Sequence, residues 1–170
     1  IPDNLPDENY GGYEFRLFVP DDAASVYTPE SETGEIVDDA IYRRNRTVEE
    51  RFKIKITSIS SGKTNSDEHL AEVTKLVQSG EDAADIILGN GKKLSNLALQ
   101  GYFVNIREIA HLDFTKPWWS AGLVDDLTFN GRMYTGSNNL SYDEFAGSKV
   151  FYFNKQLIND YKLENPYDLV

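Results

Sequence analysis

The run 89–95, GNGKKLS, comes nearest to a recognised chemical motif in this chain. A phosphate-binding loop needs a glycine five residues before its Gly-Lys pair and a Ser or Thr after the lysine, but Ile86 and Lys93 occupy those positions. The dinucleotide fingerprint also fails, because Leu94 stands at its third glycine. We therefore expect a tight turn between a strand and a helix. Its backbone N–H groups could face a ligand cleft, since open α/β sheets bind ligands at the carboxyl ends of their strands.

Groups suited to catalysis or metal binding are sparse. His69 and Glu72 have an i, i+3 spacing, but two ligands do not make a metal site, and a solvated helix face is the simpler interpretation. The chain has no cysteine and no Gly-x-Ser-x-Gly turn. Adjacent carboxylates such as Asp125 and Asp126 point to opposite faces of a strand, so they rarely act as an acid–base pair. The sequence predicts no enzyme, no metal and no cofactor.

Aromatic side chains are better candidates for contact with a ligand. Trp118 and Trp119 lie in a polar segment interrupted by Pro117, and Tyr134 and Tyr142 are the other informative rings. Core packing is the usual role of large aromatics. An exposed indole or phenol ring also offers a flat apolar face with a hydrogen-bonding edge, which suits the C–H face of a pyranose. Both interpretations stay open: packing in the core, or contact with a sugar.

Strands and helices alternate along the first hundred residues. Apolar runs and period-2 alternation predict strands at 13–19, 52–59 and 84–88, and apolar faces of period 3.6 predict helices at 35–51, 67–79 and 92–100. Because the strand at 84–88 is a continuous apolar run, we expect it to be buried on both faces. The alternating order indicates an α/β fold with a parallel-rich sheet, covering helices and right-handed crossovers.

The pattern changes after residue 101. The pair Asn130–Gly131 predicts a two-residue hairpin turn, residues 150–153 predict a strand, and residues 155–163 predict a helix. A shift in composition near Asn138 indicates a hinge into a second domain. We expect a tether at 1–12, a first domain at 13–137, a hinge or crossover at 138–147 and the start of a second domain at 148–170.

Charge and hydropathy exclude several classes of partner. The formal net charge is −11, and this field repels both nucleic acid and an anionic membrane surface. Hydrophobic residues make up 40% of the chain, which is enough for a packed core. No apolar run approaches the roughly 18–20 residues that span a bilayer. No charged and apolar leader opens the sequence, so we expect any export signal to lie upstream or to have been removed.

Five motifs follow one another in a recognisable order. They are AIYRRNRTVEERFKIKI at 40–56, ADIILGNGKKLSNLALQGYFVNI at 84–106, KPWW at 116–119, DLTFNGRMYTG at 126–136 and VFYFNKQL at 150–157. The series resembles family 1 of the extracellular solute-binding proteins, the maltose-binding type. The resemblance extends over nearly the whole chain, and the unbroken order of the motifs is more specific than any one of them. The hairpin lacks the proline usual in that family.

The resemblance implies a type II periplasmic-binding-protein-like fold, with 13–137 as an incomplete first lobe and 148–170 as the start of the second lobe. It implies extracellular capture of a small polar solute, a sugar or oligosaccharide, for an ABC importer, through hinge closure of two lobes. The partners would be the solute and the membrane subunits of the permease. A lipid anchor upstream of Ile1 would hold the protein at the outer face of the bacterial cell membrane. A secreted carbohydrate-active enzyme or a surface sensor that reuses the fold are the alternatives.

The predicted ligand contacts follow from the strand ends and from this resemblance. They are Asp21, Asp22, Asn90, Trp118, Trp119, Tyr142 and Asp143. The first three lie in loops after strands, the tryptophans offer rings, and the last two lie in the crossover. Because the loop after the third strand is Gly89-Asn90-Gly91, where the family often has an aromatic or acidic contact, the identity of the sugar is not carried over.

Overall fold

The computed structural model describes residues 3–137, 140, 142 and 152–168. Contacts along the chain divide it into two compact units, Ile1–Leu140 and Ser141–Val170. Of the predicted hinge at 138–147, only residues 140 and 142 are among those described.

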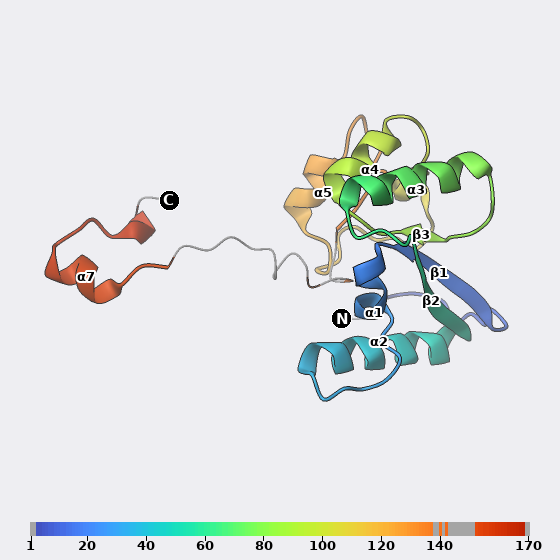
Figure 1. Cartoon of the computed structure of the whole chain (residues 1–170), viewed down its shortest axis with the longest axis horizontal. Coiled ribbons are helices and arrows are strands. Elements are labelled where there is room, and N and C mark those ends of the chain that lie inside the picture. The colour runs from blue at the N-terminus through green and yellow to red at the C-terminus, as the bar shows by residue number, and fades with distance from the viewer. Residues whose placement is uncertain (1–2, 138–139, 141, 143–151, 169–170) are drawn as a thin grey trace. The chain divides into compact units, whose positions relative to one another are not determined.

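The first unit is built on a three-stranded sheet in which all strands are parallel (Figure 1). The central strand is β1 (Tyr13–Val19), which lies between β2 (Ile54–Ser60) and β3 (Ile86–Ile87). In the register, Tyr13 pairs with Ile54, and Leu17 pairs with Ile86. The predicted α/β class is confirmed, because the three strands expected from the sequence are parallel neighbours.

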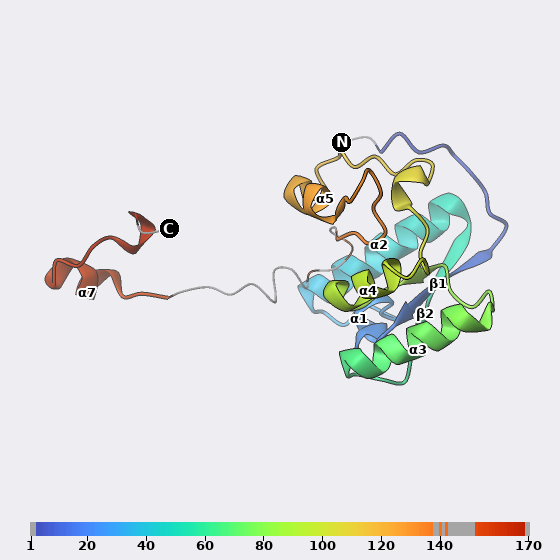
Figure 2. The ribbon, with the colours of Figure 1, turned by 90° about the horizontal axis from the view of Figure 1, so that it is seen from above.

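Helices cover both faces of this sheet (Figures 1 and 2). The helices of the first unit are α1 (Ala24–Tyr27), α2 (Ile36–Phe52), α3 (Ser66–Ser79), α4 (Gly91–Ala98) and α5 (Ala121–Leu127). Figure 1 shows α2 on one side of the sheet and α3 with α4 on the other. The three helices predicted from apolar periodicity correspond to α2, α3 and α4, whereas α1 and α5 were not predicted.

The ends of α3 follow directly from its sequence. Asn65 precedes the helix, and its side chain accepts hydrogen bonds from the backbone N–H groups of Asp67 and Glu68. Gly80 follows the last turn with φ 69°, a left-handed conformation that glycine adopts without a steric penalty. These two residues therefore fix both ends of α3, the helix of the crossover between β2 and β3.

The core lies against both faces of β1. Leu17, Phe18 and Val19 are consecutive and all buried. Phe18 packs with Val73 and two leucines of α4 on one face, whereas Leu17 and Val19 pack with Tyr27 on the other. A strand buried on both faces must be apolar at successive positions rather than at alternate ones.

The expectation that residues 84–88 form a strand buried on both faces is wrong. Only Ile86 and Ile87 are in β3, and Ile86 remains 39% exposed. The physical reason is strand order: in the described part of the chain β3 is an edge strand, and β1 holds the central position. The apolar run therefore identified a strand but not its place in the sheet.

The predicted hairpin turn at Asn130–Gly131 is confirmed. Phe129 and Arg132 exchange two backbone hydrogen bonds of 2.8 and 3.0 Å across it. Asn130 and Gly131 have φ values of 49° and 74°, as a type I′ turn requires. The pairing is a single bridge, because residues 121–127 on its amino-terminal side are helical.

The described residues of the second unit contain one short α-helix and a 3-10 turn at Pro166–Asp168. This helix, α7 (Lys155–Asp160), begins at Asn154, whose side chain accepts hydrogen bonds from two backbone N–H groups. Phe153 packs edge-on against Tyr167, with 5.2 Å between the ring centroids. The helix predicted at 155–163 is confirmed in its first part, and the strand predicted at 150–153 falls largely outside the described residues. No helix in the described ranges is long and apolar enough to cross a bilayer.

The central position of β1 predicts the effect of a core truncation. Val19→Ala should lower the free energy of unfolding by about 2 kcal/mol, because two methyl groups of a fully buried side chain are lost and a cavity remains. Ile36→Ala, at an exposed position on α2, should change it by less than about 0.5 kcal/mol. Urea denaturation measures both variants, and equal effects would contradict the assignment of Val19 to the core.

Candidate functional site

The three strands end at one edge of the sheet, here called the carboxyl edge, which comprises Val19, Ser60 and Ile87 with the residues that follow each. Backbone bonds hold these loops together. The N–H of Ser61 donates to the carbonyl of Val19 at 2.9 Å, and the N–H of Asp21 donates to the carbonyl of Lys63 at 3.0 Å. Helices α3 and α4 begin directly after the loops that leave β2 and β3. The carboxyl edge therefore combines three loops with two helix N-termini.

His69, in the first turn of α3, ties the two outer strands together at this edge. Its Nδ1 lies 2.8 Å from Ser61 Oγ, after β2, and its Nε2 lies 2.9 Å from the carbonyl oxygen of Leu88, after β3. Its ring stacks on Phe18 of β1, with 5.5 Å between centroids. Because a carbonyl oxygen only accepts, Nε2 carries the proton, and in the neutral ring Nδ1 accepts from the Ser61 hydroxyl.

This role replaces the metal site considered for His69 and Glu72. Both ring nitrogens of His69 are engaged, and Glu72 accepts a hydrogen bond of 2.8 Å from Lys75. The described residues hold no group of three or more side chains able to ligate a metal. The ring also explains Gly89, because a Cβ there would stand 3.1 Å from two atoms of the imidazole.

Three of the predicted contact residues lie at the carboxyl edge. Asp21 and Asp22 follow β1 and are exposed, and Asp21 Oδ1 accepts a hydrogen bond of 2.5 Å from Ser60 Oγ. Asn90 is exposed and caps α4, where its Oδ1 accepts from the backbone N–H of Lys93 at 3.2 Å. The cap does not use the Asn90 amide Nδ2, which makes it a donor suited to a ligand. These groups form a polar rim.

The two tryptophans lie elsewhere, in a cavity of about 740 Å³. Six aromatic side chains characterise this cavity, which we call the aromatic cavity: Tyr10, Tyr13, Phe15, Phe52, Trp118 and Trp119. Its wall also includes Ile54, at the start of β2, and Asp85, immediately before β3. The aromatic cavity therefore lies towards the amino ends of the strands, and Gly89 to Gly91 do not contribute to it.

The structure thus separates the predicted contacts into two groups. Asp21, Asp22 and Asn90 share the carboxyl edge, and Trp118 and Trp119 share the aromatic cavity. Tyr142 belongs to the second unit and is 37% exposed, while Asp143 is outside the described residues. Whether any of them contacts a ligand stays a prediction.

Sequence reasoning missed residues that line the aromatic cavity together with the tryptophans. Tyr10 lies in the segment assigned to a tether, yet its backbone N–H donates to the carbonyl of Phe52 at 2.9 Å. A tyrosine in a stretch otherwise rich in Pro, Asp, Asn and Gly is the one feature that hinted at this contact. The contact between residue 10 and the end of α2 depends on tertiary structure that no local pattern encodes.

No protein-family model matches the chain, and no curated protein sequence matches it significantly. The resemblance to solute-binding proteins therefore rests on the order of the motifs alone.

Burial of His69 predicts a dependence of stability on pH. Removal from water disfavours the imidazolium ion and lowers the pKa of His69 below its usual 6.5. The unfolded chain thus takes up this proton at higher pH than the folded chain. The stability that neutral His69 contributes is present above about pH 6.5 and is lost as the pH falls towards the folded pKa, at up to about 1.4 kcal/mol per pH unit.

Two measurements check this expectation. In His111→Gln, which leaves His69 as the single histidine, an NMR titration of the imidazole should give a midpoint below 6.5. Urea denaturation between pH 7.5 and 5.5 should show a larger loss of stability in the wild type than in His69→Gln. A midpoint at or above 6.5 would contradict the buried, neutral role of this side chain.

Proposed function

We propose that residues 13–137 form the first lobe of a solute-binding protein that captures a small polar solute. A sugar or oligosaccharide is the solute class we favour, and an ABC importer is the recipient. The observation that carries the proposal is the carboxyl edge, where the ends of three parallel strands and the N-termini of α3 and α4 meet exposed polar side chains. Ligands of open α/β sheets bind at such an edge.

The chemistry of the edge suits a ligand rich in hydroxyl groups. A sugar hydroxyl both donates and accepts hydrogen bonds, and each needs a partner once it leaves water. Carboxylate oxygens of Asp21 and Asp22 accept, and the Asn90 amide donates. The first backbone N–H groups of α3 and α4 that Asn65 and Asn90 do not cap can also donate. Because His69 fixes the loops after β2 and β3 to each other, these groups are held in place before a ligand arrives.

Capture by two lobes follows from the same geometry. A solute on the carboxyl edge contacts the first lobe on one side, and a second lobe that closes over it adds contacts present only in the closed state. Such differential contacts are what shifts a population from open to closed. The closed form would then offer the permease a surface that the open form lacks. The extracellular, lipid-anchored location belongs to this proposal, as does binding without turnover.

The test is ligand binding at Asn90. Saturation-transfer NMR of the whole chain against glucose, maltose, maltotriose and xylotriose should detect at least one binder. Asn90→Asp should weaken that binder at least threefold, because the carboxylate keeps an acceptor for the α4 cap but removes the amide donor. The bound sugar should be recovered unchanged by chromatography.

Matched variants separate a lost contact from a lost fold. Asn96→Asp introduces the same change at an exposed position of α4 and should leave sugar binding unaltered. The melting temperature of Asn90→Asp should equal that of the wild type within a degree or so. Absence of binding by all four sugars would refute the solute class, and unchanged affinity in Asn90→Asp would refute the location.

A further inference from the structure

The aromatic cavity is a second concave site, away from the carboxyl edge. Its volume of about 740 Å³ falls within the range of small-molecule pockets, and its wall is mostly apolar. The rings come from four separate places in the chain: Tyr10, the start of β1, the end of α2 and the pair Trp118–Trp119. Such a lining offers large areas for stacking, and its polar groups occupy a minority of the wall.

One wall of the cavity is a segment held by few bonds. Residues 3–10 contribute Asp3, Leu5 and Tyr10 to the lining. Arg51 of α2 holds this segment through an ion pair of 2.5 Å with Asp3 and a hydrogen bond of 3.3 Å to the carbonyl of Leu5. Tyr10 itself is 57% exposed.

The charges around the cavity select against anions. Asp3, Asp85 and Asp113 line it together with His111, and each carboxylate has a cation nearby. Asp85 accepts hydrogen bonds from the Arg16 guanidinium and from the Tyr13 hydroxyl, the latter at 2.6 Å, and Arg16 holds the pKa of Asp85 at about 2. A negative ligand would approach three carboxylates, and a positive one would compete with cations already in place. A neutral ligand avoids both costs.

Trp119 adds a polar preference. Its Nε1–H is buried and meets no acceptor among the residues that the structure describes. The opposite edge of the indole, at Cζ3, lies near Gly136 and Met133 in the protein interior. An unsatisfied buried donor is costly. Because almost none of the Nε1 surface is accessible, a ligand oxygen gains this hydrogen bond only if the indole ring shifts towards the cavity.

We infer that the aromatic cavity binds a neutral, planar ring compound that carries one acceptor oxygen. We expect a sugar to bind here less well, because the three lining carboxylates are already paired with cations and most of the wall is apolar. The site is independent of the solute proposed for the carboxyl edge, since the two share none of their defining residues. It is a second binding activity of the same domain.

Three naphthalenes test the inference with one skeleton. They are 2-acetylnaphthalene (neutral, with a carbonyl), 2-ethylnaphthalene (neutral, without oxygen) and 2-naphthoate (anionic). The readout is intrinsic tryptophan fluorescence, because both tryptophans of the chain line the cavity. With the whole chain, 2-acetylnaphthalene should quench with a Kd of roughly 0.1 mM. The anion should bind at least tenfold more weakly.

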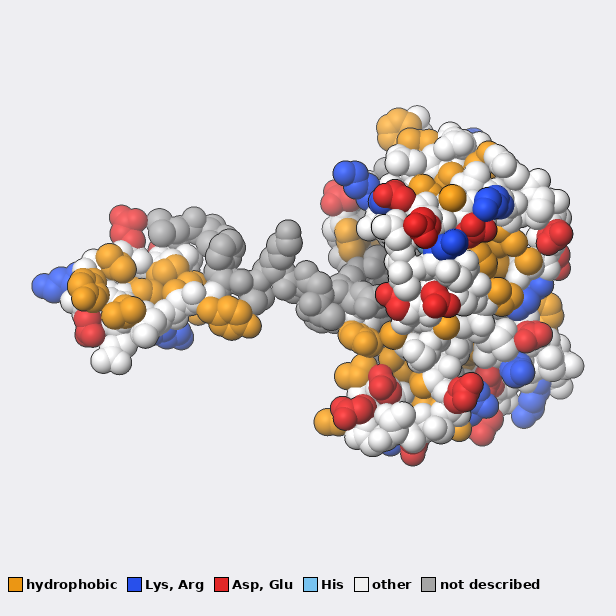
Figure 3. All heavy atoms as spheres, in the orientation of Figure 1, with side chains coloured by type: hydrophobic (Ala, Val, Ile, Leu, Met, Phe, Trp, Pro, Cys, Tyr) orange, Lys and Arg blue, Asp and Glu red, His pale blue; other side chains and the backbone are white. Residues whose placement is uncertain are grey.

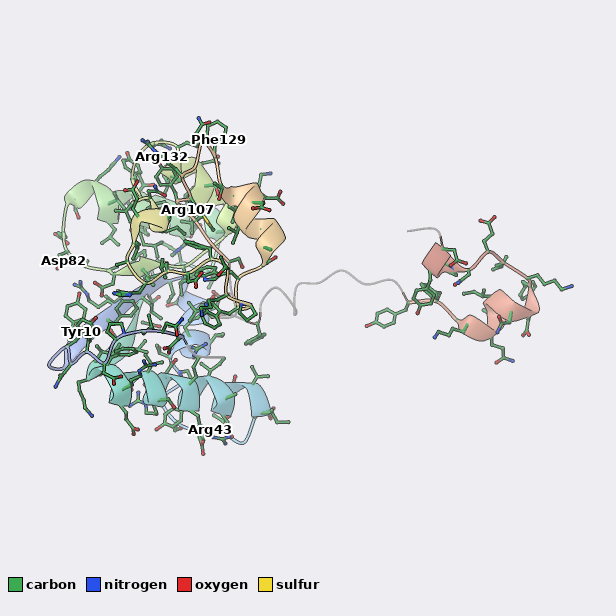
Figure 4. All side chains as sticks on the ribbon, turned by 180° about the vertical axis from the view of Figure 1, so that it is seen from behind. Tyr10, Arg43, Asp82, Arg107, Phe129 and Arg132 are labelled. Atoms are coloured by element: carbon green, nitrogen blue, oxygen red, sulfur yellow. The ribbon has the colours of Figure 1, made fainter. Side chains whose placement is uncertain are left out.

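Variants locate the site and test the hydrogen bond by calorimetry. Tyr10→Ala should weaken 2-acetylnaphthalene severalfold, whereas Phe129→Ala, an exposed aromatic that Figure 4 shows well away from Tyr10, should not. Trp119→Phe should weaken the ketone about fivefold and leave 2-ethylnaphthalene within twofold. Asn90→Asp should change neither, which distinguishes this site from the carboxyl edge.

No quenching by any naphthalene, or equal affinity for the ketone and the naphthoate, would refute a neutral-ligand site. An effect of Phe129→Ala as large as that of Tyr10→Ala would refute its location. Equal losses for ketone and hydrocarbon in Trp119→Phe would refute the hydrogen bond from Nε1.

Discussion

The parallel pairing of β1 with a strand on each side is the constraint that organises the first unit. Parallel neighbours cannot be joined by a tight turn, so the chain must cross over the sheet between them, and α2 and α3 lie in those crossovers. The same pairing makes all three strands end at one edge. It also buries β1 on both faces, which explains why Leu17, Phe18 and Val19 are apolar in succession. Site geometry and core composition therefore have one origin.

His69 shows how a single polar side chain completes this arrangement. Parallel strands are joined by main-chain bonds to their neighbours only, so β2 and β3, on either side of β1, have no bonds to each other. The imidazole supplies that link across Phe18, with a hydroxyl on one side and a carbonyl on the other. Burial of a polar ring is costly unless both nitrogens find partners, and here both do. Nothing in its sequence context, on a helix that is otherwise amphipathic, distinguishes it from a solvated histidine.

The sequence predicted elements better than it predicted their neighbours. Period and capping depend on local residues, so α3 with Asn65 and Gly80, and the turn at Asn130–Gly131, were predictable. The edge position of β3 was not predictable from the sequence, because the order of strands in a sheet depends on tertiary packing and not on the residues of one strand. Asp21 and Asn90 were placed at one edge because parallel strands force their ends together. No comparable rule predicts where the tryptophans lie. Residues 3–10 line the cavity beside them through contacts that are remote in sequence.

Two ends of one sheet thus present two different chemistries. The carboxyl edge is polar because three loops and the N-termini of α3 and α4 meet there, whereas the aromatic cavity is lined mainly by apolar rings. On the face seen in Figure 3, acidic and basic side chains are interspersed. Coupling between them would need an element with two stable arrangements. The strand that connects them, β1, pairs with β2 along its whole length and with β3 at Leu17 and Phe18. It spans roughly 20 Å without an alternative register that keeps Leu17 and Val19 buried. A rigid connection of this kind transmits little, and the two sites should therefore bind their ligands independently.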